Sequence, residues 1–276
     1  MLCVGPKKAL PWAFLLIFSA SISAQPLQKI YSGLDNATSI SVTQNHIYIV
    51  EQGKNRLLKL DHSGTLIETI GGRGSGDYQF SKPVDVDATN GLKVFVTDFN
   101  NRRVQVFDRR GQYLSSIEAR NTFGEMREFN PSQIAVDQMG EVYFTDSETR
   151  YIHHFDLDYN VLDEFKIPNE IKTVHDLSIG SSEIFILDRG SGTIHRLTLN
   201  GAYQGFYPAE EVLAFFADES GLWTSYKNQL IYESKSGEEV TVPFDSSVEP
   251  LDMYVERTSI FLLTKAELFK LSVPER

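Results

Sequence analysis

One pattern constrains the fold of this chain more than any other: a unit of four short apolar segments that recurs along the sequence. The clearest copy starts at Pro83 and consists of alternating apolar and polar residues, interrupted by polar turns. A second copy starts at Pro131, and Pro83 to Asp98 and Pro131 to Asp146 are both 15 residues, so the copies align without a gap. Short alternating segments separated by turns predict an antiparallel meander of four strands.

Weaker copies bring the number of units to six. The expected second strands end 37 to 48 residues apart, at Glu51, Asp98, Asp146, Asp188, Ser225 and Lys265. A propeller blade repeats every ~40 to 50 residues, whereas helical solenoids need a 3.6-residue apolar period that this chain lacks. The sequence therefore predicts an all-β fold, a six-bladed β-propeller of four-stranded antiparallel blades. The expected blades are approximately 37–80, 81–129, 130–171, 172–210, 211–248, and 249–276 together with 25–36.

The two ends of the chain predict how the ring closes. The last unit stops after its third strand, at Val273, and residues 27–32 form an expected strand without a blade. Pairing this N-terminal strand with the last blade would close the ring and cover two sheet edges.

The first residues predict export. Lys7 and Lys8 precede an apolar run over 9–20 and small residues over 21–24, which is the layout of a secretory signal peptide. The run is shorter than the ~20 residues that span a bilayer. We expect a signal peptide over 1–24, a propeller over 25–276, and a monomeric periplasmic or secreted product without a transmembrane anchor. The only cysteine, Cys3, lies in this leader, so no disulfide is expected.

The charge of the chain argues against nucleic acid as a partner. Its 37 acidic and 26 basic residues give a net charge of −11. Such a protein repels phosphate backbones.

The second unit resembles the NHL repeat. The resemblance rests on the glycine-rich residues 71–74 that lead to Phe80 and Pro83. It also rests on residues 96–98, Arg103 and residues 106–108. Its motif residues are strongest in the first half of the chain and drift in the last three units. The resemblance implies a propeller that serves as a binding module, but propellers host many functions. RNA-binding members of the family expose a basic surface, which this acidic chain is not expected to have.

Aspartates that end the second strands are expected to cap the turns that follow. Asp98, Asp146 and Asp188 each precede a polar turn, where a carboxylate accepts hydrogen bonds from backbone amides. Arg56 and Arg103 are expected to pair with neighbouring turn acids.

The candidate ligand site lies at the start of the innermost strands, where the units should ring the channel mouth. One residue per blade aligns there: Ser39, Asp85, Gln133, Asp176, Ala214 and Asp252. Converging carboxylates favour Ca²⁺ or a cationic ligand group. Asp85, Gln133, Asp176, Asp252 and the adjacent His175 are therefore the predicted ligand-binding residues. The alternative is that these aspartates only cap the strands.

Enzymatic function remains an alternative. Peptidyl-hydroxyglycine lyases, which use a similar propeller, bring several histidines into the channel, whereas here only His175 reaches the mouth. No complete catalytic set emerges, so no catalytic residue is assigned, no cofactor is required, and Ca²⁺ is the metal that the acids favour. The leading hypothesis is a module that binds a protein or small ligand through the channel-mouth face. A metal-dependent lyase or lactonase with Ca²⁺ or Zn²⁺ in the channel is the alternative, and a purely structural module is a third.

Overall fold

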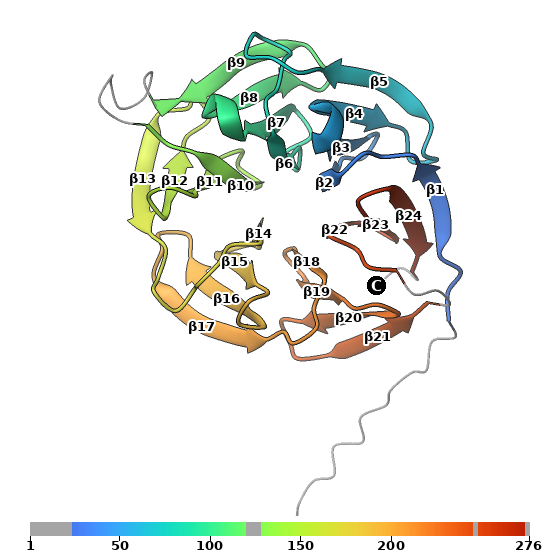
Figure 1. Ribbon diagram of the computed structural model, residues 1–276. Helices are drawn as coiled ribbons and strands as arrows, with labels where there is room; N and C mark the ends of the chain where they lie inside the picture. The colour runs from blue at the N-terminus through green and yellow to red at the C-terminus, as the bar shows by residue number, and fades with distance from the viewer. Residues whose placement is uncertain (1–23, 120–127, 245–247, 274–276) are drawn as a thin grey trace, which may run out of the picture.

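The computed structural model describes residues 24–119, 128–244 and 248–273, which form six sheets around a central axis (Figure 1). The predicted signal peptide lies almost entirely outside the described residues, so its removal stays a prediction. Among the described residues, no helix is both long and apolar enough to cross a membrane.

Each sheet has four antiparallel strands, with the first strand at the axis and the fourth at the rim. The first three blades follow in chain order. Blade 1 contains β2 (Ala37–Val42), β3 (Ile47–Glu51), β4 (Arg56–Leu60) and β5 (Leu66–Gly71). Blade 2 contains β6 (Pro83–Asp87), β7 (Lys93–Asp98), β8 (Arg103–Asp108) and β9 (Tyr113–Glu118). Blade 3 contains β10 (Pro131–Val136), β11 (Val142–Asp146), β12 (Tyr151–Phe155) and β13 (Val161–Lys166).

The second half of the chain forms three more blades of the same order. Blade 4 contains β14 (Asp176–Ile179), β15 (Glu183–Asp188), β16 (Thr193–Thr198) and β17 (Tyr203–Pro208). Blade 5 contains β18 (Ala214–Ala217), β19 (Gly221–Ser225), β20 (Gln229–Ser234) and β21 (Glu239–Pro243). Blade 6 contains β22 (Asp252–Glu256), β23 (Ser259–Leu263) and β24 (Glu267–Ser272), and its outer strand is β1 (Gln28–Ser32).

The ring closes through the N-terminal strand. β1 pairs antiparallel with β24, with Gln28 opposite Lys270 and Ser32 opposite Glu267. The six-bladed architecture is confirmed, and the last blade is built from both ends of the chain, as the leftover strand predicted. Because the two ends share one sheet, separating them would expose two strand edges.

The core lies between neighbouring blades. One apolar cluster combines Ile40 and Leu58 of blade 1 with Phe261 of blade 6, and another combines Val50 of blade 1 with Val94 of blade 2. Strand alternation places one set of side chains on each blade surface, so each blade packs against both neighbours.

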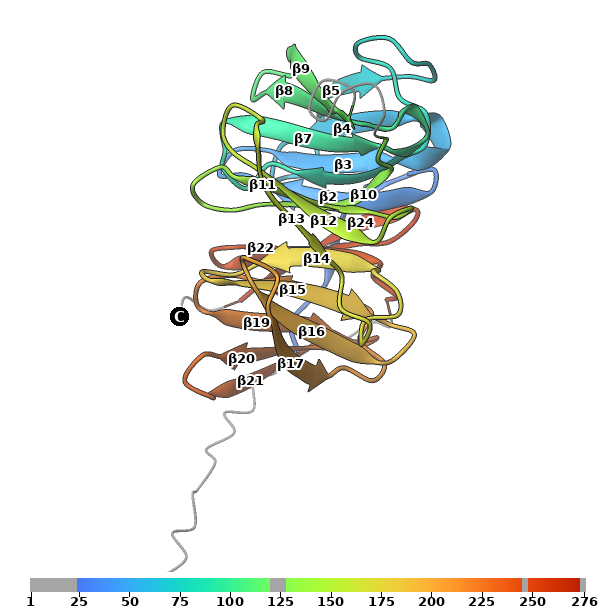
Figure 2. The same ribbon diagram turned by 90° about the vertical axis from the view of Figure 1, so that its left-hand side faces the viewer.

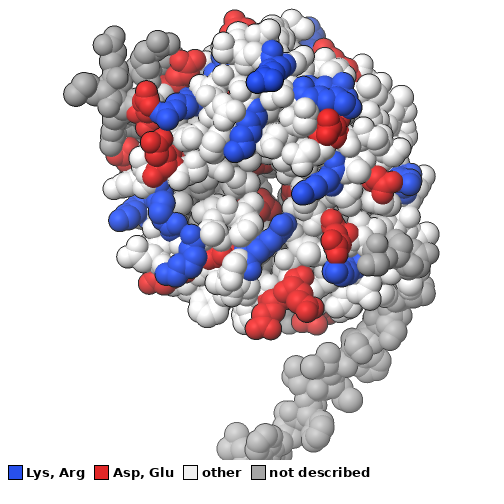
Figure 3. All heavy atoms as spheres, viewed as in Figure 1, with Lys and Arg blue, Asp and Glu red and all other residues white. Residues whose placement is uncertain are grey.

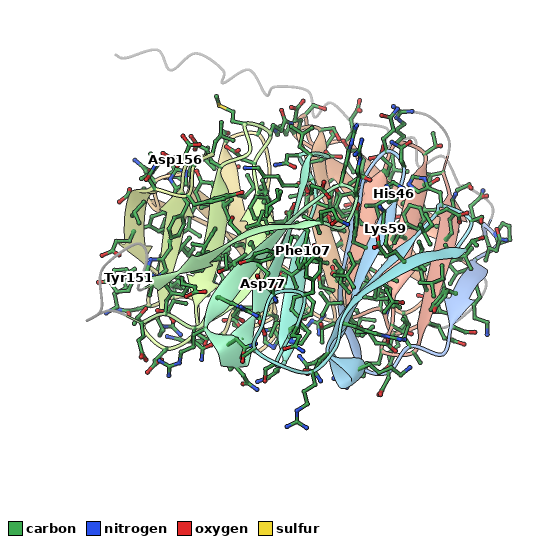
Figure 4. All side chains as sticks on the ribbon, turned by 90° about the horizontal axis from the view of Figure 1, so that it is seen from above. His46, Lys59, Asp77, Phe107, Tyr151 and Asp156 are labelled. Atoms are coloured by element: carbon green, nitrogen blue, oxygen red, sulfur yellow. The ribbon has the colours of Figure 1, made fainter. Side chains whose placement is uncertain are left out.

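The disc has two faces. The turns between second and third strands, which include η1 (Gln52–Lys54) and η2 (Phe99–Asn101), lie on the face toward the viewer of Figure 1, here the front face. The other turns within the blades lie on the opposite, back face (Figure 2). In Figure 4, Tyr151 and Asp77 lie toward the front face, whereas Asp156 and His46 lie toward the back face.

Candidate functional site in the central channel

Two rings of side chains are formed by alternate residues of the innermost strands. The first ring consists of Ser39, Asp85, Gln133, Asp176, Ala214 and Asp252. Two residues further along each strand, the second ring consists of Ser41, Asp87, Ala135, Ser178, Phe216 and Tyr254. Because side chains alternate along a strand, both rings belong to the same side of their strands.

Two first-ring aspartates connect blades to one another. Asp85 accepts a hydrogen bond from its neighbouring Val86 amide at 2.8 Å and a second, through the other oxygen, from the Ile134 amide of blade 3 at 2.7 Å. Asp252 likewise accepts from the Ile40 amide of blade 1 at 2.7 Å. These aspartates therefore cap their strands, as the alternative interpretation expected, and also hold the next blade in place.

The second ring repeats this arrangement. Asp87 accepts from the Val136 amide of blade 3 at 3.0 Å, and the Ser41 hydroxyl accepts from the Ala88 amide of blade 2 at 2.9 Å. Asp87 was not among the residues predicted from the sequence. The period-two alternation from Asp85 was the signal that could have identified it.

Asp176 differs from the other first-ring acids. Its Oδ1 accepts from the Leu177 amide at 2.7 Å, but no hydrogen bond to Oδ2 is found among the described residues. Asp176 therefore keeps one carboxylate oxygen available to a ligand.

The channel acids bind protons more tightly than ordinary aspartates. Burial raises the pKa of Asp85 to about 6, and burial together with nearby carboxylates raises the pKa of Asp87 and of Asp252 to about 7. Burial, followed by the charges of Asp252 and Asp85, raises the pKa of Asp176 well above its usual value. Desolvation and mutual repulsion both disfavour the charged form. Asp85, Asp87 and Asp252 therefore change charge near neutral pH.

A cavity of about 340 Å³ runs along the axis and is lined by Asp85, Asp87, Asp176 and Asp252. Its lining continues into the turns of the back face, where three further acids lie, Asp137, Asp218 and Glu219. From the sequence, the ligand was expected at the channel mouth formed by the starts of the innermost strands, which is on the front face. The cavity instead extends from the first ring toward the back face.

Of the five predicted ligand-binding residues, the structure brings Asp85, Asp176 and Asp252 together around the cavity. Gln133 and His175 do not line it. The Gln133 side-chain amide donates to the His175 carbonyl at 3.0 Å, and the exposed His175 ring accepts from the Arg189 amide at 3.2 Å. Both residues therefore belong to the front rim.

Arg189 was not predicted to be near the channel. Its guanidinium donates to the carbonyl of Leu251 in the segment before β22, at 2.9 Å, and also to the carbonyl of Leu213 before β18. Arg189 thus connects three blades at the front end of the channel, and its charge acts on Asp176. Figure 3 shows Lys and Arg side chains on the front face around an opening in which acidic atoms are visible.

The family model of the NHL repeat matches residues 80–107, which include β6 and β7 and most of β8. The chain is also 27% identical over 113 residues to the human E3 ubiquitin-protein ligase NHLRC1. The match covers 41% of this chain and 27% of the ligase, so the chain spans about a quarter of that relative's length. This chain is an NHL-repeat β-propeller.

Solved structures resemble this NHL propeller over most of its length. The virginiamycin B lyase from Staphylococcus aureus has a TM-score of 0.63 and 15% identity, covering 90% of this chain and 99% of that one. A gluconolactonase from Xanthomonas campestris has a TM-score of 0.69 and 13% identity, covering 94% of both chains. At these identities the likeness shows the fold and does not assign an activity.

The channel of the NHL propeller does not fit a metal ion. Both oxygens of Asp85 and of Asp252 accept backbone amide hydrogen bonds, and no group of three or more His, Cys, Asp or Glu side chains in the described part of the chain is arranged to hold a metal. Ca²⁺ requires several converging oxygen ligands, and Zn²⁺ requires three or four close ligands.

Proposed function

We propose that this NHL propeller is an exported binding module whose ligand places an ammonium or guanidinium group in the channel, approaching from the back face. The observation that carries the proposal is the set of four channel carboxylates, Asp85, Asp87, Asp176 and Asp252. Within the described residues, no ion pair joins any of them to a lysine, arginine or histidine. Buried charges are ordinarily paired, so a cation supplied by a ligand would complete the site.

The charges at the two ends of the channel support approach from the back face. Asp137, Asp218 and Glu219 line the cavity there, whereas the guanidinium of Arg189 lies at the front end. A concave site lined by one sign of charge attracts the opposite ion. A cationic side chain of a partner protein and a small amine both have the required chemistry.

Calorimetric titration with butylguanidinium and butylammonium, with neutral butanol as the control ligand, tests this proposal. We expect both cations to bind at pH 8 and butanol not to bind. Binding should weaken toward pH 5.5, because the channel acids with pKa values of about 6 to 7 become protonated and the cation must displace their protons.

The decisive variant is Asp176→Asn, which removes the charge and keeps the shape of the side chain. We expect it to weaken cation binding by at least ~10-fold, which corresponds to ~1.4 kcal/mol. Asp77→Asn is the matched control, because Asp77 is exposed on the front side, away from the cavity. Equal binding by both variants, or no binding of either cation to the unmodified chain, would reject the proposal.

A further inference from the structure

Three large apolar side chains are exposed together on the back face of blades 2 and 3. Leu92 is 68% exposed in the turn before β7, Met139 is 76% exposed in the turn before β11, and Leu157 is 55% exposed in the turn before β13. Single exposed apolar residues are ordinary, but a group of them on one surface marks an interaction site. These three residues are here called the apolar patch.

Contacts between the turns bring the segments that carry the three residues together. The Leu157 side chain lies over Gly140, where an added Cβ would be 2.7 Å from its Cδ2, and Gly140 follows Met139 directly. The Lys93 ammonium, from the residue after Leu92, donates to the Leu157 carbonyl at 3.3 Å. The turns of two blades are therefore held against each other beneath the exposed side chains.

A recess of about 220 Å³ lies between Met139 and Leu157, and its other lining residues are Glu141, Asp156 and Asp158. Apolar surface rimmed by carboxylates suits a group that is itself apolar and positively charged. It opposes anionic lipid headgroups, and it opposes a second copy of the same acidic chain.

The patch adjoins the channel through a single turn. Asp137 and Gln138 line the cavity, and Met139, the next residue, belongs to the patch. A bound chain that covers the patch would therefore pass the back mouth of the channel within a few residues.

We propose that the apolar patch docks a segment of a partner protein in which apolar side chains flank a lysine or arginine. The apolar side chains cover Leu92, Met139 and Leu157, and the basic side chain enters the channel. Only the second of these contacts rests on the function proposed above. The patch supplies apolar contact area, and the acids around it and in the channel select a positively charged partner.

Fluorescence anisotropy with a labelled eight-residue peptide of alternating leucine and lysine tests this proposal on the full chain. We expect binding of this peptide, and at least 10-fold weaker binding of one peptide with glutamate in place of lysine and of another with serine in place of leucine. The double variant Met139→Ser/Leu157→Ser should weaken binding of the parent peptide at least 10-fold. Ile67→Ser is the matched control, because Ile67 is 52% exposed on the outer strand β5 of blade 1, outside the apolar patch.

The outcomes separate the two proposals. If Asp176→Asn weakens binding of butylguanidinium and the peptide while the double variant leaves peptide binding unchanged, the docking proposal fails and the channel function stands. If the double variant weakens peptide binding and Asp176→Asn changes neither ligand, the patch stands and the channel function fails. Sedimentation with anionic vesicles and a concentration series of the chain alone complete the test. Patch-dependent binding to vesicles, or patch-dependent self-association, in place of peptide binding would overturn the proposal.

Discussion

Two sets of acids in this propeller have the same chemistry and opposite environments. The turn acids, which end the second strands, are Glu51, Asp98, Asp146 and Asp188. Each accepts a hydrogen bond from the backbone amide 16 or 17 residues earlier, in the segment that leads into its own blade. The channel acids, Asp85, Asp87, Asp176 and Asp252, also accept backbone amides, and three of them, Asp85, Asp87 and Asp252, each accept one from the next blade. The turn acids therefore organise single blades, whereas Asp85, Asp87 and Asp252 join neighbouring blades.

In the described part of the chain, the turn acids Glu51 and Asp98 form ion pairs with lysine or arginine, whereas no channel acid does. Burial alone would raise the pKa of Glu51, but hydrogen bonds from Arg56 and Lys54 outweigh it and lower the pKa. Against the same effect of burial, hydrogen bonds from His153 and Thr149 lower the pKa of Asp146 to about 2. Asp98 is the exception, because burial outweighs its hydrogen bonds and raises its pKa. The turn acids are therefore satisfied by hydrogen bonds and, for Glu51 and Asp98, by ion pairs, whereas no ion pair among the described residues reaches a channel acid.

The largest expected effect comes from removing a turn acid whose partner is buried. Asp98 accepts from the Arg103 guanidinium at 3.0 Å and from the Ser81 amide at 2.7 Å, and Arg103 is itself buried. We expect Asp98→Ala to lower the free energy of unfolding by about 3 to 5 kcal/mol, because it leaves a buried cation without its carboxylate. Urea denaturation at pH 7 measures the change.

Asp108→Ala is the control for this variant. Asp108 accepts only the Arg110 and Gln112 amides of an exposed turn, so we expect a loss of about 1 kcal/mol. If both variants lost the same stability, the buried pair between Asp98 and Arg103 would not be what distinguishes the two aspartates.

The pH dependence of stability should separate the two sets of acids. Three channel acids, Asp85, Asp87 and Asp252, have folded-state pKa values of about 6 to 7, above the usual 3.8, so between pH 4 and 7 the folded chain binds more protons than the unfolded chain. The free energy of unfolding should therefore fall as pH rises through 6 to 7, by about 2 to 4 kcal/mol between pH 5 and 8.

Below pH 4 the turn acids reverse the trend. Glu51, Asp146 and Asp188 have lowered pKa values, so the stability that they contribute is lost as pH falls from about 4 toward 2. Thermal melts across this range should give the highest melting temperature between about pH 4 and 5.5. A maximum at pH 8 would show that the channel acids are ionised without penalty.

The sequence predicted the scaffold well because the scaffold depends on local repeats. The matched spacing from Pro83 to Asp98 and from Pro131 to Asp146 gave the blade, and the unassigned strand over 27–32 predicted its pairing with β24. The repeated strand pattern also allowed the residues of the first channel ring to be aligned. Phase within a strand determines which side chains face the axis.

The repeats could not predict from which end of the channel a ligand would approach. The direction of approach depends on Arg189, whose guanidinium reaches the carbonyl of Leu251, 62 residues later in the chain. The apolar patch similarly depends on Leu157 lying over Gly140. Contacts between turns of different blades leave no periodic signal in the sequence, so the front rim, the back mouth and the patch required the structure.

The smallest and sharpest of these effects comes from one channel acid, in the variant Asp87→Asn. Near pH 5 the folded chain carries a protonated Asp87, so asparagine replaces it with little change in charge. At pH 8 the wild-type side chain is ionised in a buried position, whereas asparagine stays neutral. The difference in unfolding free energy between pH 5 and pH 8 should therefore shrink by about 1 to 2 kcal/mol. Asp77→Asn, at an exposed position, should leave that difference unchanged, and urea denaturation at both pH values measures it.

An unchanged difference in Asp87→Asn would mean that the carboxylate is already stabilised by the Thr89 and Val136 amides, which donate to it at 2.7 and 3.0 Å. Asp87 would then resemble a turn acid, and the contrast between the two sets would be confined to the first ring.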